Sequence, residues 1–245
     1  MRFVDSHLHL YEPEAVRKVK LAESTRIMLL TCGEDRETSS VALRLSKAYP
    51  ETVKAFIGLH PSKALEATSL DWLEQDLGWA SGVGEVGLDP KYSETGPGSN
   101  QMKALRAQLE LAQAAGKPVQ VHSRDAEREC VDTLGGFTLS SVLLHWFQGE
   151  ELLQEVVGRG YFVSFGPALL YSKKLQRMAT RSPQGHVLAE TDSPVPFGPL
   201  GGVHGSSLIP SVVFKLSELW REGFEDARAT LAGNALRFLG LSEKG

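Results

Sequence analysis

Short apolar runs rich in β-branched residues recur along the chain and mostly alternate with segments of helical period. Such alternation favours a parallel sheet, because parallel neighbours are usually joined by a helical crossover. Eight runs favour a closed (β/α)8 barrel of the TIM type over an open sheet. The expected strands are Phe3–Asp5, Ile27–Leu30, Val53–Ile57, Gly82–Val86, Pro118–Val121, Val142–Leu144, Tyr161–Val163 and Val187–Ala189.

The clearest helix is expected over Asn100–Ala115, where apolar residues recur at helical spacing and Gly116 provides a stop signal. Two more helices are expected after the last strand, one around residues 212–220 and one over Ala227–Leu239. A chain of 245 residues could hold one or two domains by length. Since no linker, repeat or low-complexity tract interrupts it, we predict a single domain over residues 1–245.

The net charge of −4 provides no general attraction for a nucleic acid, although a local basic patch in a cleft would still allow one. Cys32 and Cys130 lie far apart and form no C-x-x-C motif, so we expect two buried, reduced thiols that pack as small apolar groups. No signal-peptide core or membrane-length apolar stretch is present. We therefore expect a cytoplasmic, soluble monomer with no membrane contact.

Potential metal ligands recur at or near the carboxyl ends of the expected strands. His7 and His9 are two residues apart, so on a strand both imidazoles would point to one face, as two ligands of a transition metal do. By themselves the two could equally be surface residues. The ends of parallel barrel strands share one rim, where barrel active sites are built. The further candidates on this rim are His60, Glu85, His122, His145 and Asp192.

Seven candidates exceed the three or four ligands of one zinc site. Two ions roughly 3.5–4 Å apart, bridged by a carboxylate, would use them all and would suit in-line hydrolysis of a phosphoester. The predicted cofactors are therefore two divalent metal ions. The many histidines favour zinc, manganese, iron or cobalt over magnesium, which prefers oxygen ligands.

The motifs that contain these residues occur in an order that resembles the TatD family of metal-dependent hydrolases, within the amidohydrolase-like barrel superfamily. The resemblance covers almost the whole chain. The motifs are Asp5–His9, Gly58–Pro61, Gly84–Asp89, Pro118–Arg124, His145–Phe147, Phe162–Gly166, Glu190–Pro194 and Gly233–Ala235.

The resemblance implies phosphodiester hydrolysis, typically by a deoxyribonuclease that removes nucleotides from a 3′ end. DNA ends or another phosphodiester are the expected substrate partners. The resemblance also implies a ligand assignment, with one ion held by His7, His9 and Asp192, the other by His122 and His145, and Glu85 bridging them.

Two of these residues are also catalytic candidates. Asp192 is expected to act as a ligand and as the proton acceptor for a metal-activated water. His60 is a secondary candidate for orienting the substrate or the leaving group. The alternative for His60 is a structural role, in which it caps the turn at Pro61.

The chain departs from the family pattern where substrate would be held. Ser62 stands where members usually carry a second histidine, Pro90–Ser93 where they often have tyrosines ending in an arginine, and Gly198–Ser207 where they usually offer an arginine. The segments Asp89–Ser99 and Gly198–Ser207 are candidate substrate loops or, alternatively, simple irregular connections.

Arg124 is the best remaining candidate for a phosphate clamp, because it follows His122 by two residues on the same rim. Lys91 and Lys63 are possible helpers. The alternative for Arg124 is a surface ion pair with Asp125 or Glu127. With so few cations, we expect a weak grip on DNA.

Other functions are less well supported. Gly82–Gly87 matches the G-x-G-x-x-G dinucleotide fingerprint, but that motif must open a helix, and Pro90 and a Pro/Gly-rich stretch follow instead. A serine hydrolase is also not indicated, because the chain has no G-x-S-x-G elbow. The main alternative is a small-molecule amidase, lactonase or phosphotriesterase on the same metal barrel, because fold and metals do not determine the substrate. A non-catalytic binding protein would not need so complete a ligand set.

Overall fold

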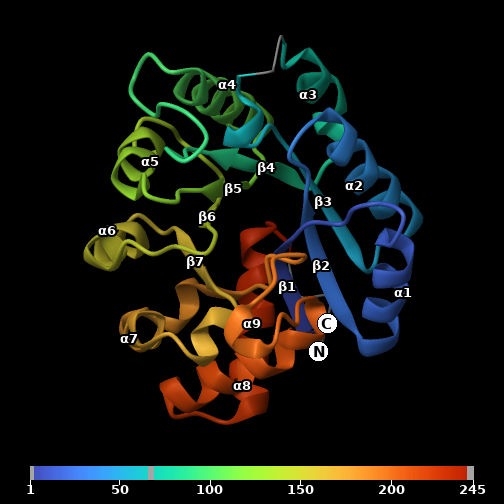
Figure 1. Cartoon of the computed structure of the whole chain (residues 1–245), viewed down its shortest axis with the longest axis vertical. Helices are drawn as coiled ribbons and strands as arrows, with labels where there is room; N and C mark the ends of the chain where they lie inside the picture. The colour runs from blue at the N-terminus through green and yellow to red at the C-terminus, as the bar shows by residue number, and fades with distance from the viewer. Residues whose placement is uncertain (1–2, 66–68, 242–245) are drawn as a thin grey trace.

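The computed structural model describes residues 3–65 and 69–241. Its centre is an eight-stranded parallel sheet in which each strand pairs with the next along the chain, and the helices surround this barrel (Figure 1). The expected (β/α)8 TIM-type class is therefore confirmed, and the single domain over residues 1–245 stays a prediction. The strands are β1 (Phe3–Leu8), β2 (Ile27–Cys32), β3 (Val53–Ile57), β4 (Gly82–Gly87), β5 (Val119–His122), β6 (Val142–Leu144), β7 (Phe162–Phe165) and β8 (Val187–Ala189).

The helices follow the strands in the order that the sequence predicts. Within the described ranges, none of them is both long and apolar enough to cross a membrane. They are α1 (Ala15–Thr25), α2 (Arg36–Ala48), α3 (Asp71–Asp76), α4 (Asn100–Ala115), α5 (Glu127–Leu134), α6 (Leu153–Gly158), α7 (Lys173–Arg181), α8 (Ile209–Trp220) and α9 (Phe224–Phe238).

Helix α4 has the bounds that the sequence predicts, because its end signals are local. The Ser99 hydroxyl accepts a hydrogen bond from the backbone N of Met102 at 3.1 Å, which caps the first turn. Gly116 ends the helix in the left-handed conformation, with φ of 62°. The last helix, α9, begins at Phe224 rather than at the expected Ala227.

The glycines of the G-x-G-x-x-G match serve strand packing. All of Gly82–Gly87 is buried strand, and residues 88–99 contain no helix, so the rejection of the dinucleotide site is confirmed. A Cβ atom at Gly82 would lie 2.2 Å from the ring of Phe56. A Cβ atom at Gly87, where φ is +151°, would lie 1.9 Å from the carbonyl oxygen of His122. Only glycine lets β4 approach its neighbours this closely.

Strand β1 is irregular where it delivers its histidines. Its pairing with β2 shifts register between Asp5 and Leu8. Val4 and Leu8 would share one face of a regular strand, yet they pack in two separate buried clusters. One extra residue in a strand turns the following side chains to the opposite face. The strand also runs further than the expected Phe3–Asp5, so His7 lies within it.

The barrel closes beyond the end of β8. The backbone N of Asp192 donates to the carbonyl oxygen of His7 at 2.9 Å, and that of His9 donates to the carbonyl oxygen of Ser193 at 2.7 Å. These bonds hold the segment after β8 against the end of β1. The closure of the sheet therefore places Asp192 beside both histidines.

Asn234 ties α9 to the start of β8 and is expected to be important for stability. Its side-chain nitrogen donates to the carbonyl oxygens of Gln184 and Val187, both at 2.7 Å, and the residue is 1% exposed. Asn234→Ala leaves both carbonyls without this donor, so we expect the free energy of unfolding to fall by roughly 1–3 kcal/mol. Each kcal/mol corresponds to about 2–4 °C in melting temperature for a domain of this size.

Thermal and urea unfolding monitored by circular dichroism measure this effect. Asn100→Ala is the matched control, because Asn100 is an exposed asparagine in the first turn of α4. Equal stability of the two variants would show that the Asn234 contacts do not hold α9 in place.

Candidate metal centre

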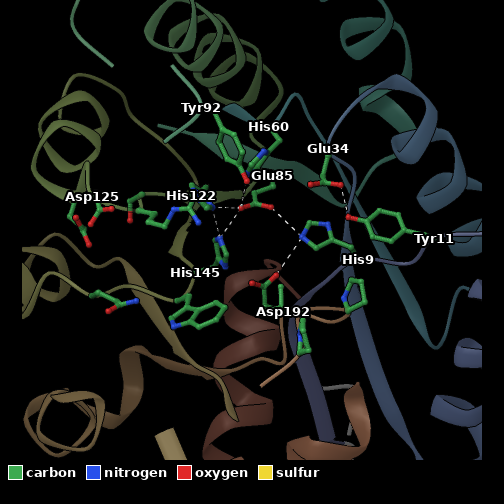
Figure 2. Close-up of a pocket in the computed structure, with 18 of the residues that line it drawn as sticks. His9, Tyr11, Glu34, His60, Glu85, Tyr92, His122, Asp125, His145 and Asp192 are labelled. Atoms are coloured by element: carbon green, nitrogen blue, oxygen red, sulfur yellow. Dashed lines mark hydrogen bonds and ion pairs between the residues drawn. The ribbon is translucent and has the colours of Figure 1, made fainter. Parts of the chain in front are cut away.

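The predicted ligands converge at the carboxyl end of the barrel, where all of them except His7 line a cavity of about 770 Å³ (Figure 2). Their ligand atoms form overlapping groups, and within each group these atoms lie within 4.8 Å of one another. The separation of the residues along the chain shows that the barrel, and not local sequence, assembles them. The groups found among the described residues are His7–His9–Asp192, His7–Glu85–His145 and His60–Glu85–His122.

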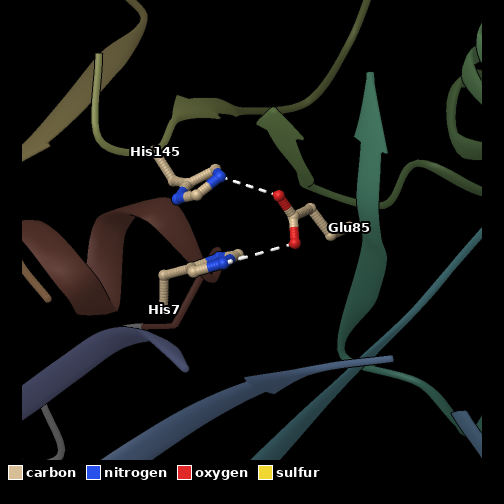
Figure 3. Close-up of side chains that lie close together, drawn as sticks. All are labelled: His7, Glu85 and His145. Carbon is tan, nitrogen blue, oxygen red and sulfur yellow. Dashed lines mark ion pairs between the residues drawn. The ribbon is translucent and has the colours of Figure 1, made fainter. Parts of the chain in front are cut away.

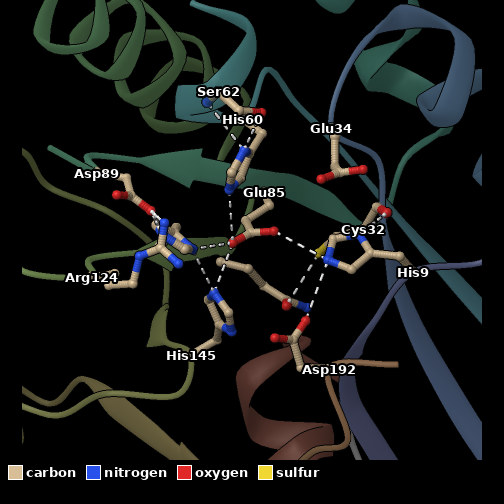
Figure 4. Close-up of polar contacts among 12 residues, drawn as sticks. His9, Cys32, Glu34, His60, Ser62, Glu85, Asp89, Arg124, His145 and Asp192 are labelled. Carbon is tan, nitrogen blue, oxygen red and sulfur yellow. Dashed lines mark hydrogen bonds and ion pairs between the residues drawn. The ribbon is translucent and has the colours of Figure 1, made fainter. Parts of the chain in front are cut away.

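Glu85 lies between two sets of histidines, the first set being His7 and His9 and the second His122 and His145. Its Oε1 atom is 2.7 Å from His122 Nδ1 and 2.7 Å from His145 Nε2. Its Oε2 atom faces the other set, 3.3 Å from His9 Nε2 and 3.6 Å from His7 Nε2 (Figure 4). One carboxylate that presents one oxygen to each set is the arrangement that a bridging ligand needs.

Asp192 joins the first set of histidines, and it comes from the segment after β8. Its Oδ1 atom lies 3.6 Å from His7 Nε2 and 3.5 Å from His9 Nε2. Ligands bound at about 2.1 Å to one tetrahedral ion lie about 3.4 Å apart, so these separations fit a shared cation. The rings of His7 and His145 stack with centroids 3.8 Å apart, which holds the two sets side by side (Figure 3).

Hydrogen bonds at Nδ1 orient the first set of histidines. His7 Nδ1 donates to the Gln120 side-chain oxygen at 2.6 Å, and His9 Nδ1 donates to the Cys32 carbonyl oxygen at 3.0 Å. Each bond turns the Nε2 atom of its ring toward the carboxylates, which is the position that a metal ligand needs. The Nε2 atom of His7 is buried and has no hydrogen-bond partner. The donor set therefore fits a metal ion.

Gln120 and Cys32 were not predicted as site residues. Gln120 is a polar side chain inside the apolar run of β5, and that position is the signal that could have identified it. Both cysteines are buried and free as expected, but Cys32 is not a simple apolar filler. Its thiol donates to Gln120 Oε1 at 3.3 Å and lies 3.6 Å from His7 Nδ1.

His122 is held by a carboxylate on each side. Its Nε2 atom donates to Asp89 Oδ2 at 2.8 Å, and this bond turns Nδ1 toward Glu85. Burial opposes a charge on this ring, but the hydrogen bonds with Asp89 and Glu85 outweigh it and raise the pKa of His122 to about 9. Asp89 thus acts as the partner that orients a ligand histidine, and it was not predicted as a site residue.

His60 differs from the other histidines in its tautomer. Its Nδ1 atom accepts a hydrogen bond from the backbone N of Ser62 at 3.2 Å and lies 2.8 Å from the Ser62 hydroxyl (Figure 4). The cap of the Pro61 turn, which was the structural alternative, is therefore present. Burial lowers the pKa of His60 to about 4, so the neutral ring carries its proton on Nε2, 3.6 Å from Glu85 Oε1.

Glu85, Asp192 and His145 are in ionisation states that suit metal binding. Burial would raise the pKa of Glu85, but the adjacent histidines hold it well below its usual range. Burial acts likewise on Asp192, and a hydrogen bond from His9 contributes most to lowering its pKa. Burial also lowers the pKa of His145 to about 4. Ionised carboxylates and a neutral imidazole are the forms that coordinate a metal.

Glu190 lies behind His145 and was also missed. It is fully buried, accepts a hydrogen bond from the Ser164 hydroxyl at 2.5 Å, and has Oε2 3.8 Å from His145 Nδ1. Burial raises the pKa of Glu190 to about 8. A carboxylic acid directly after the apolar run of β8 is the sequence signal that could have indicated this buried position.

The cations expected to bind substrate have different positions. Arg124 lines the cavity, but its ion pair is with Asp89 at 2.6 Å and not with Asp125 or Glu127. Lys91 and Lys63 are not among the residues that line the cavity, and their roles stay predictions. Lys174, at the start of α7, lines the cavity and was not predicted.

The two candidate loops also differ. Tyr92, from Asp89–Ser99, lines the cavity. No residue of Gly198–Ser207, which lies wholly within the described part of the chain, does so. The Ser206 hydroxyl instead donates to Asp5 Oδ2 at 2.7 Å, which fastens this loop to β1. Only the first loop is therefore placed to touch a substrate in this cavity.

Residues 4–240 match the family described as TatD related DNase. An uncharacterized metal-dependent hydrolase of Bacillus subtilis, YabD, is 27% identical over 95% of this chain and 97% of its own length. The human deoxyribonuclease TATDN3 is 30% identical over 78% of this chain and 77% of its own length. A 3′-5′ ssDNA/RNA exonuclease TatD of Edwardsiella piscicida is 30% identical over 74% of this chain and 73% of its own length. The crystal structure of the TatD homologue YJJV from Escherichia coli superimposes with a TM-score of 0.87 at 25% identity, covering 98% of this chain and 99% of the other.

Proposed function

The chain belongs to the TatD family of metal-dependent hydrolases, and from this premise we propose that it cleaves phosphodiester bonds as a 3′–5′ exodeoxyribonuclease. The observation that carries the proposal is the position of Glu85, which presents one oxygen to each of two histidine sets. A two-ion centre of this kind suits in-line displacement at phosphorus. The nuclease names of the human and Edwardsiella relatives support DNA as the substrate.

Two divalent ions would be held by the residues that the family resemblance implies. When bound, such ions supply an activated water and neutralise the charge that develops on the phosphate. The proposed ligands are His7, His9 and Asp192 for one ion, His122 and His145 for the other, and Glu85 for both.

Two side chains are positioned to handle protons. Asp192 lines the cavity and its lowered pKa keeps it ionised, so it can accept a proton from the attacking water. His60 directs its Nε2–H toward the centre because Ser62 occupies Nδ1. This tautomer suits an orienting or donating role toward the leaving group better than metal ligation.

The charge around the cavity supports a weak grip on DNA. Arg124 and Lys174 are the lysine and arginine side chains that line it, and Arg124 already pairs with Asp89. Three carboxylates outside the ligand groups also line the cavity, which opposes a polyanion. With one or two phosphate contacts, the slope of log K against log salt should be shallow, about −0.7 for each contact on a single strand. These carboxylates are Glu34, Asp125 and Glu127.

Hydrolysis of end-labelled DNA tests the proposed function. We expect the metal-loaded protein to release the label of a 3′-labelled single strand as mononucleotide, while the same strand labelled at its 5′ end shortens stepwise. Duplex DNA, RNA, a simple phosphodiester and a lactone form the comparison panel, each assayed with manganese, zinc, magnesium or a chelator. Brisk turnover of the lactone with intact DNA would replace the nuclease with a small-molecule hydrolase.

A further inference from the structure

Part of the cavity surface beside the metal centre is apolar. Trp146 follows His145 directly, and the segment Pro194–Pro196 begins two residues after Asp192; all of these residues line the cavity. The Trp146 ring contacts the ring of Phe197, the next residue of that segment, with centroids 5.6 Å apart. The two segments therefore meet and form one apolar surface, which we call the indole wall. Metal binding and proton transfer give no reason for it.

The backbone at Trp146 is in an unfavourable conformation. Its φ is +41°, in the left-handed region that a bulky residue rarely adopts. The backbone N of Trp146 donates to the Ser164 hydroxyl at 3.3 Å, which helps to hold this geometry. Strained residues of this kind persist where the surroundings enforce them, and they cluster at ligand sites. Here the strain presents an indole to the cavity.

Trp146 is also the aromatic side chain best able to receive a flat ligand. Phe197 is only 3% exposed and does not line the cavity, whereas Trp146 does. The Tyr11 ring lies parallel to His9, and its hydroxyl donates to Glu34. The Tyr92 ring is covered by the Arg124 guanidinium, 5.4 Å from its centroid. Among the described residues, the tyrosines and tryptophans that line the cavity are Tyr11, Tyr92 and Trp146.

We propose that the indole wall is a stacking platform for the nucleobase of the 3′-terminal nucleotide. This inference rests on the proposed function and deepens it, since it defines the substrate as a phosphodiester with an aromatic base next to the scissile bond. Stacking accepts any base, because every base has a π face. An apolar contact beside a charged centre also compensates for the small number of cations around the cavity.

Two oligonucleotides that differ only in their last residue test the proposal. One ends in an ordinary nucleotide, and the other ends in a tetrahydrofuran residue without a base. We expect the wild-type holoenzyme to prefer the ordinary end in kcat/KM by about 5- to 150-fold, which is the value of one base stack. Trp146→Ala should abolish this preference, mainly through a higher KM on the ordinary end, so that kcat/KM becomes the same for both ends.

Trp146→Leu repeats the test with a side chain that still fills space against Phe197, in case the alanine variant does not fold. An equal loss on both substrates, in a variant that melts like the wild type, would assign Trp146 a structural role and overturn the proposal. If a Trp146 variant kept the full wild-type preference for the ordinary end, that result would also overturn the proposal.

Tryptophan fluorescence provides a readout that does not need turnover. Titration of the holoenzyme with deoxyadenosine monophosphate should quench the wild type and Trp79→Leu, but not Trp146→Leu. Trp79 is the control because it is 80% exposed and precedes β4, at the amino end of the strands. Quenching without any DNA hydrolysis would refute the proposed nuclease function but support a nucleobase site at Trp146. Hydrolysis without quenching or base preference would refute the base site alone.

Discussion

Replacing Glu85 by alanine is expected to release both metal ions and to lower turnover by about 1000-fold or more, because charge stabilisation by the ions contributes several kcal/mol. The reason is geometric. Glu85 is within reach of both histidine sets, and no other described carboxylate faces His122 and His9 together. Elemental analysis after dialysis measures the bound metal directly, without reference to any substrate.

Two variants make the Glu85 result specific. His122→Ala removes a ligand from one set only, so it should lose one ion and keep the other. Glu127→Ala removes a carboxylate that lines the cavity outside the ligand groups, and it should keep both. If Glu85→Ala retained two tightly bound ions, Glu85 could not be the shared ligand.

Asp192→Asn should lower kcat by about 100- to 10,000-fold at saturating manganese, which is the range for loss of a positioned general base. Asparagine preserves the size of the side chain but removes its charge and its ability to accept a proton. Since the backbone N of Asp192 forms the closing bond to His7, the barrel itself should stay intact. Circular dichroism and melting temperature verify the fold while steady-state kinetics measure the rate.

Asp125→Asn is the matched control for this prediction. Asp125 also lines the cavity and has a positive φ, but it belongs to none of the ligand groups. It should keep a rate within a few-fold of the wild type. An unchanged rate in Asp192→Asn at saturating metal would remove Asp192 from the chemistry.

Most of the fold could be predicted because its signals are local. The alternation of apolar runs and helical periods located all eight strands, and Ser99 and Gly116 mark the ends of α4 at the residue level. The ligand candidates could be predicted for a related reason. Once the strands are parallel and closed, their carboxyl ends must share a rim, so polar residues at those ends meet without knowledge of any contact.

The contacts that orient those candidates join residues far apart in the chain, and no local pattern encodes them. His7 meets Gln120 across 113 residues, and that bond decides which nitrogen faces the centre. Arg124 has charged residues near it in sequence, yet its partner is Asp89 because the ends of β4 and β5 are neighbours in the barrel.

The sequence by itself therefore determined the position of the strands, the barrel class and the histidines and carboxylates proposed as ligands at its rim, since each of these follows from the pattern along the chain. Only the tertiary structure decided how the rim is arranged. The register shift in β1 turns His7 and His9 to their face, and closure beyond β8 brings Asp192 to them. The strained backbone of Trp146 likewise depends on its surroundings. Side-chain direction at a strand end depends on register and closure, which are properties of the whole barrel.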